Sequence, residues 1–336
     1  MIQTLYIEEE VSGHPRTQEI CSRFPSAARI PIARYGEIFN RKGQNFRLQK
    51  KRPALILAKK YGHFVLPAPD GYGVGGRRNF YFSHMLNCLY DCRYCFLQGM
   101  YRSAHYVLFV NYEDFEKAMA AKLQEAPNTD AYFFSGYDCD SLALESVTRF
   151  FESFYSFFAE NDRAWLELRT KSAQMKPLLA AKPLPNVIVA FSFTPEPTGR
   201  VLEHGVPPLA QRLDAIKALE DKGWNIGLRF DPMIYTEDYH DQYRRLFADV
   251  FGRVQADRLH SVSLGPFRLP RPYFEVMSRL YPDERLFAGP LVARGRMVSY
   301  RKDKEEEMLS FCTRELMPYI SEEIFFPAEI METATG

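Results

Sequence analysis

The sequence predicts an α/β fold, a partial (β/α)6 barrel with an N-terminal extension and a small C-terminal appendage. The first observation is that strand-like and helix-like segments alternate between residues 81 and 265. The second is that prolines interrupt this pattern from residue 266 onward. Repeated strand-helix units imply a parallel sheet with right-handed crossovers. In such a barrel the functional site lies at the carboxyl ends of the strands.

Six short segments rich in β-branched and aromatic residues are the expected strands of the barrel. They are residues 79–83, 131–135, 166–169, 187–191, 226–230 and 259–263. The expected helices are residues 112–123, 141–159, 173–181, 208–223 and 239–251. In the second of these helices, phenylalanines recur at helical spacing, which favours packing against the sheet over a base-stacking surface.

The chain divides into three expected parts. Residues 1–80 form an extension that packs on the barrel, residues 81–265 form the barrel, and residues 266–336 cover the barrel mouth. Within the last part we expect a helix at 273–280, a strand at 296–300 and a charged helix at 303–319.

Composition and charge narrow the function classes. The net charge is only +1, so a global basic surface for nucleic acid is excluded and any such contact must be local. Two local basic patches exist, one spread over residues 41–60 and one over residues 294–304. No segment reaches the roughly twenty apolar residues of a membrane span. The acidic start has no signal-peptide pattern, so we expect a cytoplasmic protein with no membrane partner.

Three cysteines within eight residues are the most specific motif of the sequence. Cys88, Cys92 and Cys95 can ligate three irons of a 4Fe-4S cluster and leave the fourth iron open to a cofactor. A zinc site that uses His84 as fourth ligand is an alternative, although no second ligand pair follows. A disulfide framework is disfavoured because six cysteines are too few for a chain of this length.

The cysteine spacing, followed by a partial barrel, resembles the radical S-adenosylmethionine superfamily. Further segments are similar to landmarks of its spore photoproduct lyase family, namely residues 95–98, 169–171, 191–193, 202–205 and 231–235. The resemblance implies a barrel of the radical S-adenosylmethionine type with a 4Fe-4S cluster and S-adenosyl-L-methionine as cofactors. It also implies an external one-electron reductant of the flavodoxin or ferredoxin type.

The family resemblance also implies roles for single residues. Lys171 and Ser192 are expected beside S-adenosylmethionine, at the ends of inner strands, and Ser141 is expected to contact this cofactor too. Tyr94 matches a tyrosine of the family's radical relay, whereas Phe96 stands where the family has a second tyrosine.

The group that returns a hydrogen atom to the product is a cysteine in this family. Alignment without gaps places Tyr137 at that position, and Cys139 follows two residues later on the same side of an extended strand. We expect the flanking Asp138 and Asp140 to raise the pKa of the Cys139 thiol and keep it protonated.

Three functions remain open at this stage. The first is a carbon-carbon lyase that repairs thymine dimer lesions in DNA, with Arg296, Arg301 and Lys302 holding the phosphates of the substrate. The second is a radical enzyme acting on a different, non-nucleic substrate. The third is a DNA-binding protein whose metal site is only structural.

Overall fold

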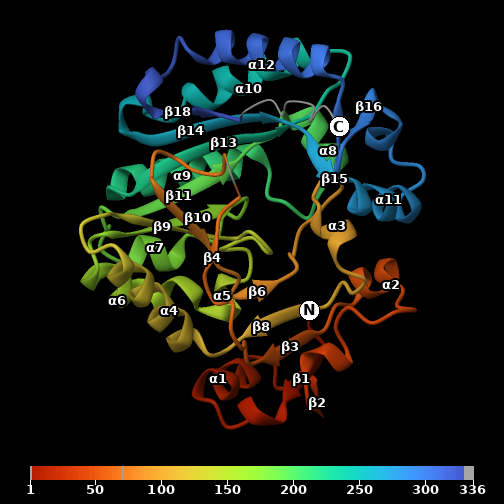
Figure 1. Cartoon of the computed structure of the whole chain (residues 1–336), viewed down its shortest axis with the longest axis vertical. Coiled ribbons are helices and arrows are strands. Elements are labelled where there is room, and N and C mark those ends of the chain that lie inside the picture. Colours follow the sequence, from red (N-terminus) through yellow and green to blue (C-terminus); the bar gives the residue numbers. More distant parts are fainter. Residues whose placement is uncertain (1, 70, 329–336) are drawn as a thin grey trace.

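The centre of the molecule is a curled eight-stranded sheet. A computed structural model describes residues 2–69 and 71–328 (Figure 1). The strand order is β18-β14-β13-β11-β10-β9-β5-β4. The strands are β4 (Leu66–Pro67), β5 (Arg78–Tyr81), β9 (Ala131–Ser135), β10 (Ala164–Thr170), β11 (Val187–Ser192), β13 (Asn225–Met233), β14 (Leu259–Pro266) and β18 (Phe325–Pro327). From β5 to β14 every neighbouring pair is parallel, which confirms the predicted six-strand barrel.

Helices cover the outer face of this sheet. They are α4 (Tyr112–Glu125), α5 (Glu145–Thr148), α6 (Phe150–Glu160), α7 (Lys176–Ala180), α8 (Glu196–Leu202), α9 (Leu209–Lys222) and α10 (Tyr239–Phe251). The phenylalanine stripe of α6 is buried, as predicted, with Phe150, Phe154 and Phe158 at most 1% exposed. Burial of aromatic side chains at helical spacing is what attaches this helix to the sheet.

The predicted helix over residues 141–159 is wrong in its first half. The chain instead makes a turn, the short α5 and then α6, with Arg149 between them in the left-handed conformation at a φ of 46°. The buried carboxylate of Glu145 accepts the backbone N–H of Phe151 at 3.1 Å. Because this carboxylate satisfies a free N–H of the first turn, α6 begins as a new helix at this point.

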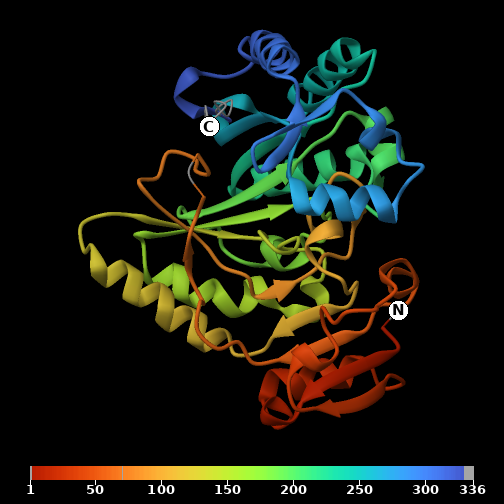
Figure 2. The ribbon, with the colours of Figure 1, turned by 45° about the vertical axis from the view of Figure 1, so that its right-hand side comes forward.

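The N-terminal extension forms a second sheet together with residues on either side of the cysteine motif. Its strand order is β2-β1-β3-β8-β6. The strands are β1 (Thr4–Glu8), β2 (Ala28–Ile32), β3 (Leu55–Ala58), β6 (Met85–Leu86) and β8 (Tyr106–Phe109), and the helices are α1 (Pro15–Arg23) and α2 (Phe46–Lys51). The cysteine loop therefore leaves this sheet at β6 and returns to it at β8. Figure 2 shows this sheet beside the barrel.

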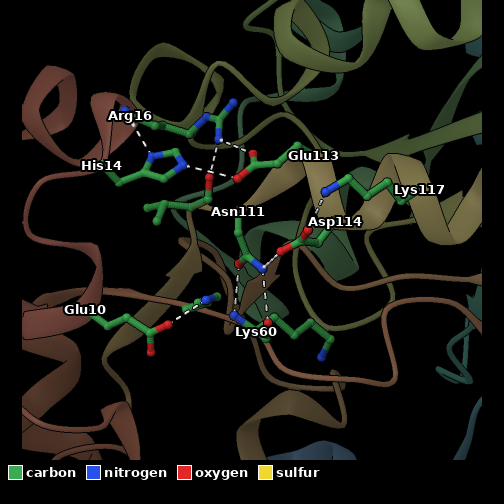
Figure 3. Close-up of polar contacts among 10 residues, drawn as sticks. Glu10, His14, Arg16, Lys60, Asn111, Glu113, Asp114 and Lys117 are labelled. Atoms are coloured by element: carbon green, nitrogen blue, oxygen red, sulfur yellow. Dashed lines mark hydrogen bonds and ion pairs between the residues drawn. The ribbon is translucent and has the colours of Figure 1, made fainter.

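Polar contacts join the extension to α4. The Nε2 atom of His14 lies 3.3 Å from the Glu113 carboxylate, and the Arg16 guanidinium lies 3.7 Å from it (Figure 3). Asn111 accepts the backbone N–H of Lys60 and donates to its carbonyl, at 2.9 and 3.0 Å. These paired contacts fix the position of the extension relative to the barrel.

The C-terminal part contains an antiparallel three-stranded sheet. After this sheet, one helix and one strand pack against the barrel. Its elements are β15 (Arg268–Pro270), α11 (Arg271–Leu280), β16 (Leu291–Arg294), β17 (Met297–Tyr300) and α12 (Lys302–Leu316). Helix α12 packs beside α10, and β18 then pairs with β14 at the end of the large sheet. Among the described residues, no helix is long and apolar enough to cross a membrane.

One close contact brings α11 over the cysteine loop. A Cβ atom at Gly99, in α3 (Leu97–Met100), would lie 2.4 Å from the carbonyl oxygen of Tyr273 in α11. Only glycine permits this approach, because a methyl group would collide with backbone that cannot move aside. The C-terminal part is therefore held directly against the segment that follows Cys95.

Candidate active site

A cavity of about 290 Å³ lies at the carboxyl ends of the barrel strands, between the cysteine loop and the C-terminal part. It brings together most of the residues singled out in the sequence. These are Cys88, Cys92, Tyr94, Cys95, Phe96, Tyr137, Cys139, Lys171 and Ser192. Further lining residues include Lys50, Tyr72, Asp140, Arg169, Asp231 and Arg268.

The backbone of the cysteine loop is tied down on two sides. Strand β7 (Asp91–Cys92) pairs antiparallel with β12 (Glu203–His204), and the N–H of Arg93 donates to the carbonyl of Leu202 at 2.8 Å. On the other side, the ammonium group of Lys50 donates to the carbonyls of Cys88 and Tyr90, each at 3.2 Å. These contacts fix the backbone on both sides of the three cysteines.

The donor set fits an iron-sulfur cluster better than a zinc ion. The three thiols are free and open into the same cavity. Among residues 2–69 and 71–328, no three His, Cys, Asp or Glu side chains converge on a single metal ion. Thiolates around a four-iron cube are spaced more widely than ligands of one ion. His84, the alternative zinc ligand, is stacked on Phe150 at 3.9 Å and does not line the cavity.

Tyr94 belongs to a buried polar network, here called the Tyr94 network, which consists of Tyr94, Lys171, Thr194, Glu203 and Arg212. The Tyr94 hydroxyl donates to the Glu203 carboxylate. Lys171 and Arg212 each lie 3.3–3.4 Å from the same carboxylate. Burial opposes ionisation of Glu203, but the two cations lower its pKa overall. Burial and this carboxylate hold the pKa of Tyr94 well above its usual range, so the phenol stays protonated.

The network also reaches the two predicted cofactor residues on the inner strands. Lys171 follows β10, lines the cavity, and its side chain is 11% exposed. Ser192 ends β11, and its carbonyl accepts the Arg212 guanidinium at 2.8 Å. Both side chains face the cavity that the cysteines share, which is where a cofactor carboxylate or ribose would meet them.

Ser141 is placed differently. Among the described residues the cavity lining does not include it. Its hydroxyl pairs with that of Ser135 at 2.8 Å, and its N–H donates to the carbonyl of Arg169. A Cβ atom at Gly136, where φ is +82°, would lie 2.6 Å from the Ser141 hydroxyl. Ser141 therefore supports a turn that needs glycine, and its contact with a cofactor stays a prediction.

Cys139 is buried and lines the cavity. The pKa of its thiol is raised well above the usual range, as expected, although burial is the larger cause and Asp138 and Asp140 are smaller ones. Asp140 serves the backbone instead. It accepts the N–H groups of Leu142, Ala143 and Lys171 at 2.7–3.0 Å, and the hydroxyl of Thr170. This carboxylate therefore fixes the Cys139 turn against β10.

Tyr137 belongs to an aromatic cluster on another side of the cavity. The aromatic cluster is Tyr72, Tyr81, Phe96, Tyr137 and Tyr273. The Tyr137 ring lies 4.4 Å from that of Tyr81 and 5.6 Å from that of Phe96. Phe96 in turn stacks with Tyr273 of α11 at 6.4 Å. Tyr137 and Phe96, both singled out in the sequence, are thus brought into one group of rings.

A buried group of charged residues adjoins the cavity through Arg169, and sequence reasoning missed it. It consists of Glu167, Arg169 and Arg229 and is here called the ionic floor. Glu167, 1% exposed, pairs with the fully buried Arg229 at 2.8 Å and with Arg169 at 3.0 Å. Although burial raises the pKa of Glu167, the two guanidinium groups outweigh it and bring the value to about 2. The signal was present in the strands, since Glu167 and Arg169 alternate within β10 and so share one face.

The three predicted phosphate-binding residues lie outside this cavity lining. Arg296 is exposed in the turn between β16 and β17. Arg301 pairs with Asp303 at 2.8 Å, and Lys302 lies 3.7 Å from Glu306. Their part in substrate binding stays a prediction. Arg268, which sequence reasoning did not select, lines the cavity from β15.

Comparison with known proteins places this geometry in one family. Residues 80–306 match the model of the spore photoproduct lyase family. The chain is 24% identical to a spore photoproduct lyase of Bacillus subtilis (strain 168), covering 99% of this chain and 98% of that protein. A second relative, a spore photoproduct lyase of Geobacillus sp. (strain Y412MC61), is 22% identical over 59% of each chain.

Solved structures show the same fold. A spore photoproduct lyase mutant with bound S-adenosylmethionine and dinucleoside spore photoproduct has a TM-score of 0.86 at 17% identity, covering 98% of this chain and 99% of that one. A spore photoproduct lyase complexed with dinucleoside spore photoproduct has a TM-score of 0.82 at 17% identity, covering 97% and 99% of the chains.

Proposed function

Because the chain belongs to the spore photoproduct lyase family of radical S-adenosylmethionine enzymes, we propose that it is a radical carbon-carbon lyase that reverts a thymine lesion in DNA. The observation that carries the proposal is that one cavity holds the three motif cysteines together with Lys171, Ser192 and Cys139. These residues are accounted for without assuming a hydrolase mechanism, in which a base would activate a neighbouring nucleophile.

The residues divide the work by chemistry. Cys88, Cys92 and Cys95 would hold a 4Fe-4S cluster, and Lys171 and Ser192 would bind S-adenosylmethionine. With one electron supplied from outside, the cluster and S-adenosylmethionine would together provide a 5'-deoxyadenosyl radical. The chain's own residues orient the cofactor, keep water out of the cavity and keep the Tyr94 phenol protonated.

Two residues could return a hydrogen atom to the substrate. Cys139 is buried, protonated and faces the cavity. Tyr137 lies two residues earlier and is also cavity-lining. A thiol gives up hydrogen more readily than a phenol, so we favour Cys139 as the donor. The substrate would then be the spore photoproduct, the lesion bound as a dinucleoside by the relatives' structures.

A second candidate function is a radical reaction on another substrate. The observation that favours it is the aromatic cluster, in which Phe96 and Tyr137 are neighbours 5.6 Å apart. A cavity wall of this kind binds planar or apolar groups and does not require DNA.

One experiment tests both candidates. The protein is reconstituted anaerobically with iron and sulfide, reduced with dithionite, and given S-adenosylmethionine with and without dinucleoside spore photoproduct. We expect 5'-deoxyadenosine in both cases and thymine recovery in the second. Formation of 5'-deoxyadenosine without thymine recovery favours the second candidate, and absence of 5'-deoxyadenosine contradicts both.

A further inference from the structure

A basic groove lies against the outer side of the cysteine loop. Here called the α2 groove, it is lined by Asn45, Arg47, Leu48, Lys50, Lys51, Asp91, Arg93 and Tyr281. The segment that supplies most of it, residues 41–52, contains six Lys or Arg residues, and no acidic residue occurs from 38 to 69. In a chain with a net charge of +1, this is a strong local concentration of positive charge.

The groove is joined directly to the backbone of the three cysteines. Lys50 lines both the groove and the cavity, and it donates to the carbonyls of Cys88 and Tyr90. Asp91 and Arg93, on either side of Cys92, form an ion pair at 2.8 Å. A protein bound in the groove would therefore contact the residues on either side of Cys92 and Lys50, which holds the Cys88 carbonyl.

The outermost cations of the groove are not neutralised. Among the described residues, neither Arg47 nor Lys51 has an acidic group within ion-pair distance, and both side chains are exposed. Leu48, on the same helix, is 61% exposed, and Leu89, between Cys88 and Tyr90, is 41% exposed. The surface thus combines free positive charge with exposed leucines close to the cysteine loop.

We propose that the α2 groove is the docking surface for an acidic one-electron carrier protein that reduces the cluster. The proposal rests on the function proposed above, because that chemistry consumes one electron from outside the chain. The carrier loses one electron, the bound cluster gains it, and no bond or proton changes at this contact. Complementary charge would guide the carrier to this exposed and basic surface beside the loop.

Exposed Leu48, which lines the groove, and exposed Leu89 in the adjoining cysteine loop favour a protein over DNA at this surface. Exposed apolar side chains beside charged ones are typical of protein interfaces, where burial of the apolar groups adds to affinity. Phosphate contacts gain nothing from them, since DNA-backbone binding depends on charged and polar groups. The groove also has a lining different from that of the cavity, whereas a DNA lesion would have to enter the cavity to reach the cysteines.

The test compares two sources of electrons. The double variant Arg47→Glu/Lys51→Glu reverses charge in the groove without touching Lys50 or the cavity. With reduced flavodoxin as the donor, formation of 5'-deoxyadenosine should fall about tenfold or more, because like charges now oppose docking. With dithionite, which needs no docking surface, the rate should stay within about twofold of wild type.

A matched control carries the same change of charge elsewhere. Arg245 in α10 and Arg258 are exposed. Figure 1 shows α10 at the top of the molecule, well away from α2 at the lower right. Arg245→Glu/Arg258→Glu should leave both rates unchanged. An equal loss of the flavodoxin-driven rate in the control and the groove variant would overturn the proposal, since net charge would then explain the effect.

A binding measurement keeps this test separate from the proposed function. Calorimetric titration of flavodoxin into the unloaded protein should give an affinity that weakens about tenfold in the groove variant and falls as salt is added. This result supports the surface even if no S-adenosylmethionine cleavage occurs with dithionite, which would contradict the proposed function alone. Unchanged flavodoxin affinity with loss of DNA affinity would overturn the docking proposal in favour of DNA.

If the groove variant proves unstable, wild-type protein gives the same answer. Raising the ionic strength should slow the flavodoxin-driven rate and leave the dithionite-driven rate unchanged. Equal salt dependence of the two rates would contradict a charged docking surface.

Discussion

The Tyr94 network and the aromatic cluster form two sides of the cavity, one charged and one aromatic. Their residues in the cysteine loop, Tyr94 and Phe96, are only two positions apart. Tyr94 is held in a network of charges through Glu203, Lys171 and Arg212. The Phe96 ring instead lies beside the rings of Tyr137 and Tyr273. Under the proposed function, the first side would hold the cofactor and the second would meet the substrate. The charged side and the aromatic side are thus separate groups of residues, which single substitutions can probe one at a time.

The largest expected effect comes from replacing one of the three cysteines that would bind the cluster. Cys92→Ala should abolish both 5'-deoxyadenosine formation and the visible absorption of the reconstituted protein. Loss of a ligand costs more than the roughly 10–100-fold loss of affinity seen when an outer contact is removed. Iron analysis measures this directly. Cys21→Ala, which removes a buried cysteine in α1, should retain its iron, and an iron-free Cys21→Ala would show that the assay reports folding instead.

The next effect concerns the ionic floor beneath both sides. Glu167→Gln leaves Arg229 buried without its anion, and should lower the free energy of unfolding at pH 7 by about 3 kcal/mol. Since the folded pKa of Glu167 is about 2 against 4.5 for an ordinary glutamate, its contribution is present above pH 4.5 and is lost as the pH falls towards 2.

Chemical denaturation at several pH values measures this change. The difference between wild type and Glu167→Gln should therefore shrink between pH 4.5 and 3. The exposed Glu160→Gln in α6 serves as the control and should change stability little at any pH. A difference between wild type and Glu167→Gln that stays constant across this range would contradict the ion pairs.

A smaller effect on stability distinguishes the charged side of the cavity from the aromatic side. Tyr94→Phe removes the hydroxyl that donates to Glu203 and should lower the free energy of unfolding by about 1–3 kcal/mol. Phe96→Tyr, the reverse change, adds a hydroxyl among rings at a half-buried position and should change it by less than about 1 kcal/mol. Thermal and denaturant unfolding compare the two. Equal costs for both would remove the distinction between the charged and the aromatic side.

The smallest effect on stability, and the sharpest on product, concerns the hydrogen donor. Cys139→Ser should leave 5'-deoxyadenosine formation intact and lower thymine recovery from the lesion about tenfold, a change of about 1.4 kcal/mol in the barrier. Tyr137→Phe should lower it less. Quantifying thymine and its side products after a single turnover distinguishes them. A larger loss with Tyr137→Phe would assign the donor to Tyr137, the position that ungapped alignment selects.

Several elements followed from local pattern. The strands of the barrel and most of its helices were correct, because burial on both faces leaves long apolar runs bounded by turns. The cysteine motif could also be recognised from local sequence. Three ligands to one cluster must be close in sequence when a single loop supplies them. The break between α5 and α6 at Arg149 could not be predicted from the sequence, because it depends on the Glu145 carboxylate capping α6.

By itself, the sequence determined the barrel, the cysteine loop and the family. Only the tertiary structure decided how Cys92 is fixed by β12, how Glu203 meets Tyr94 more than 100 residues away, and how Glu167 meets Arg229. It also left Ser141 beneath a turn and set Arg296, Arg301 and Lys302 apart from the cavity. The physical reason is that periodicity and spacing report local burial, whereas contacts between distant charges depend on which strands become neighbours.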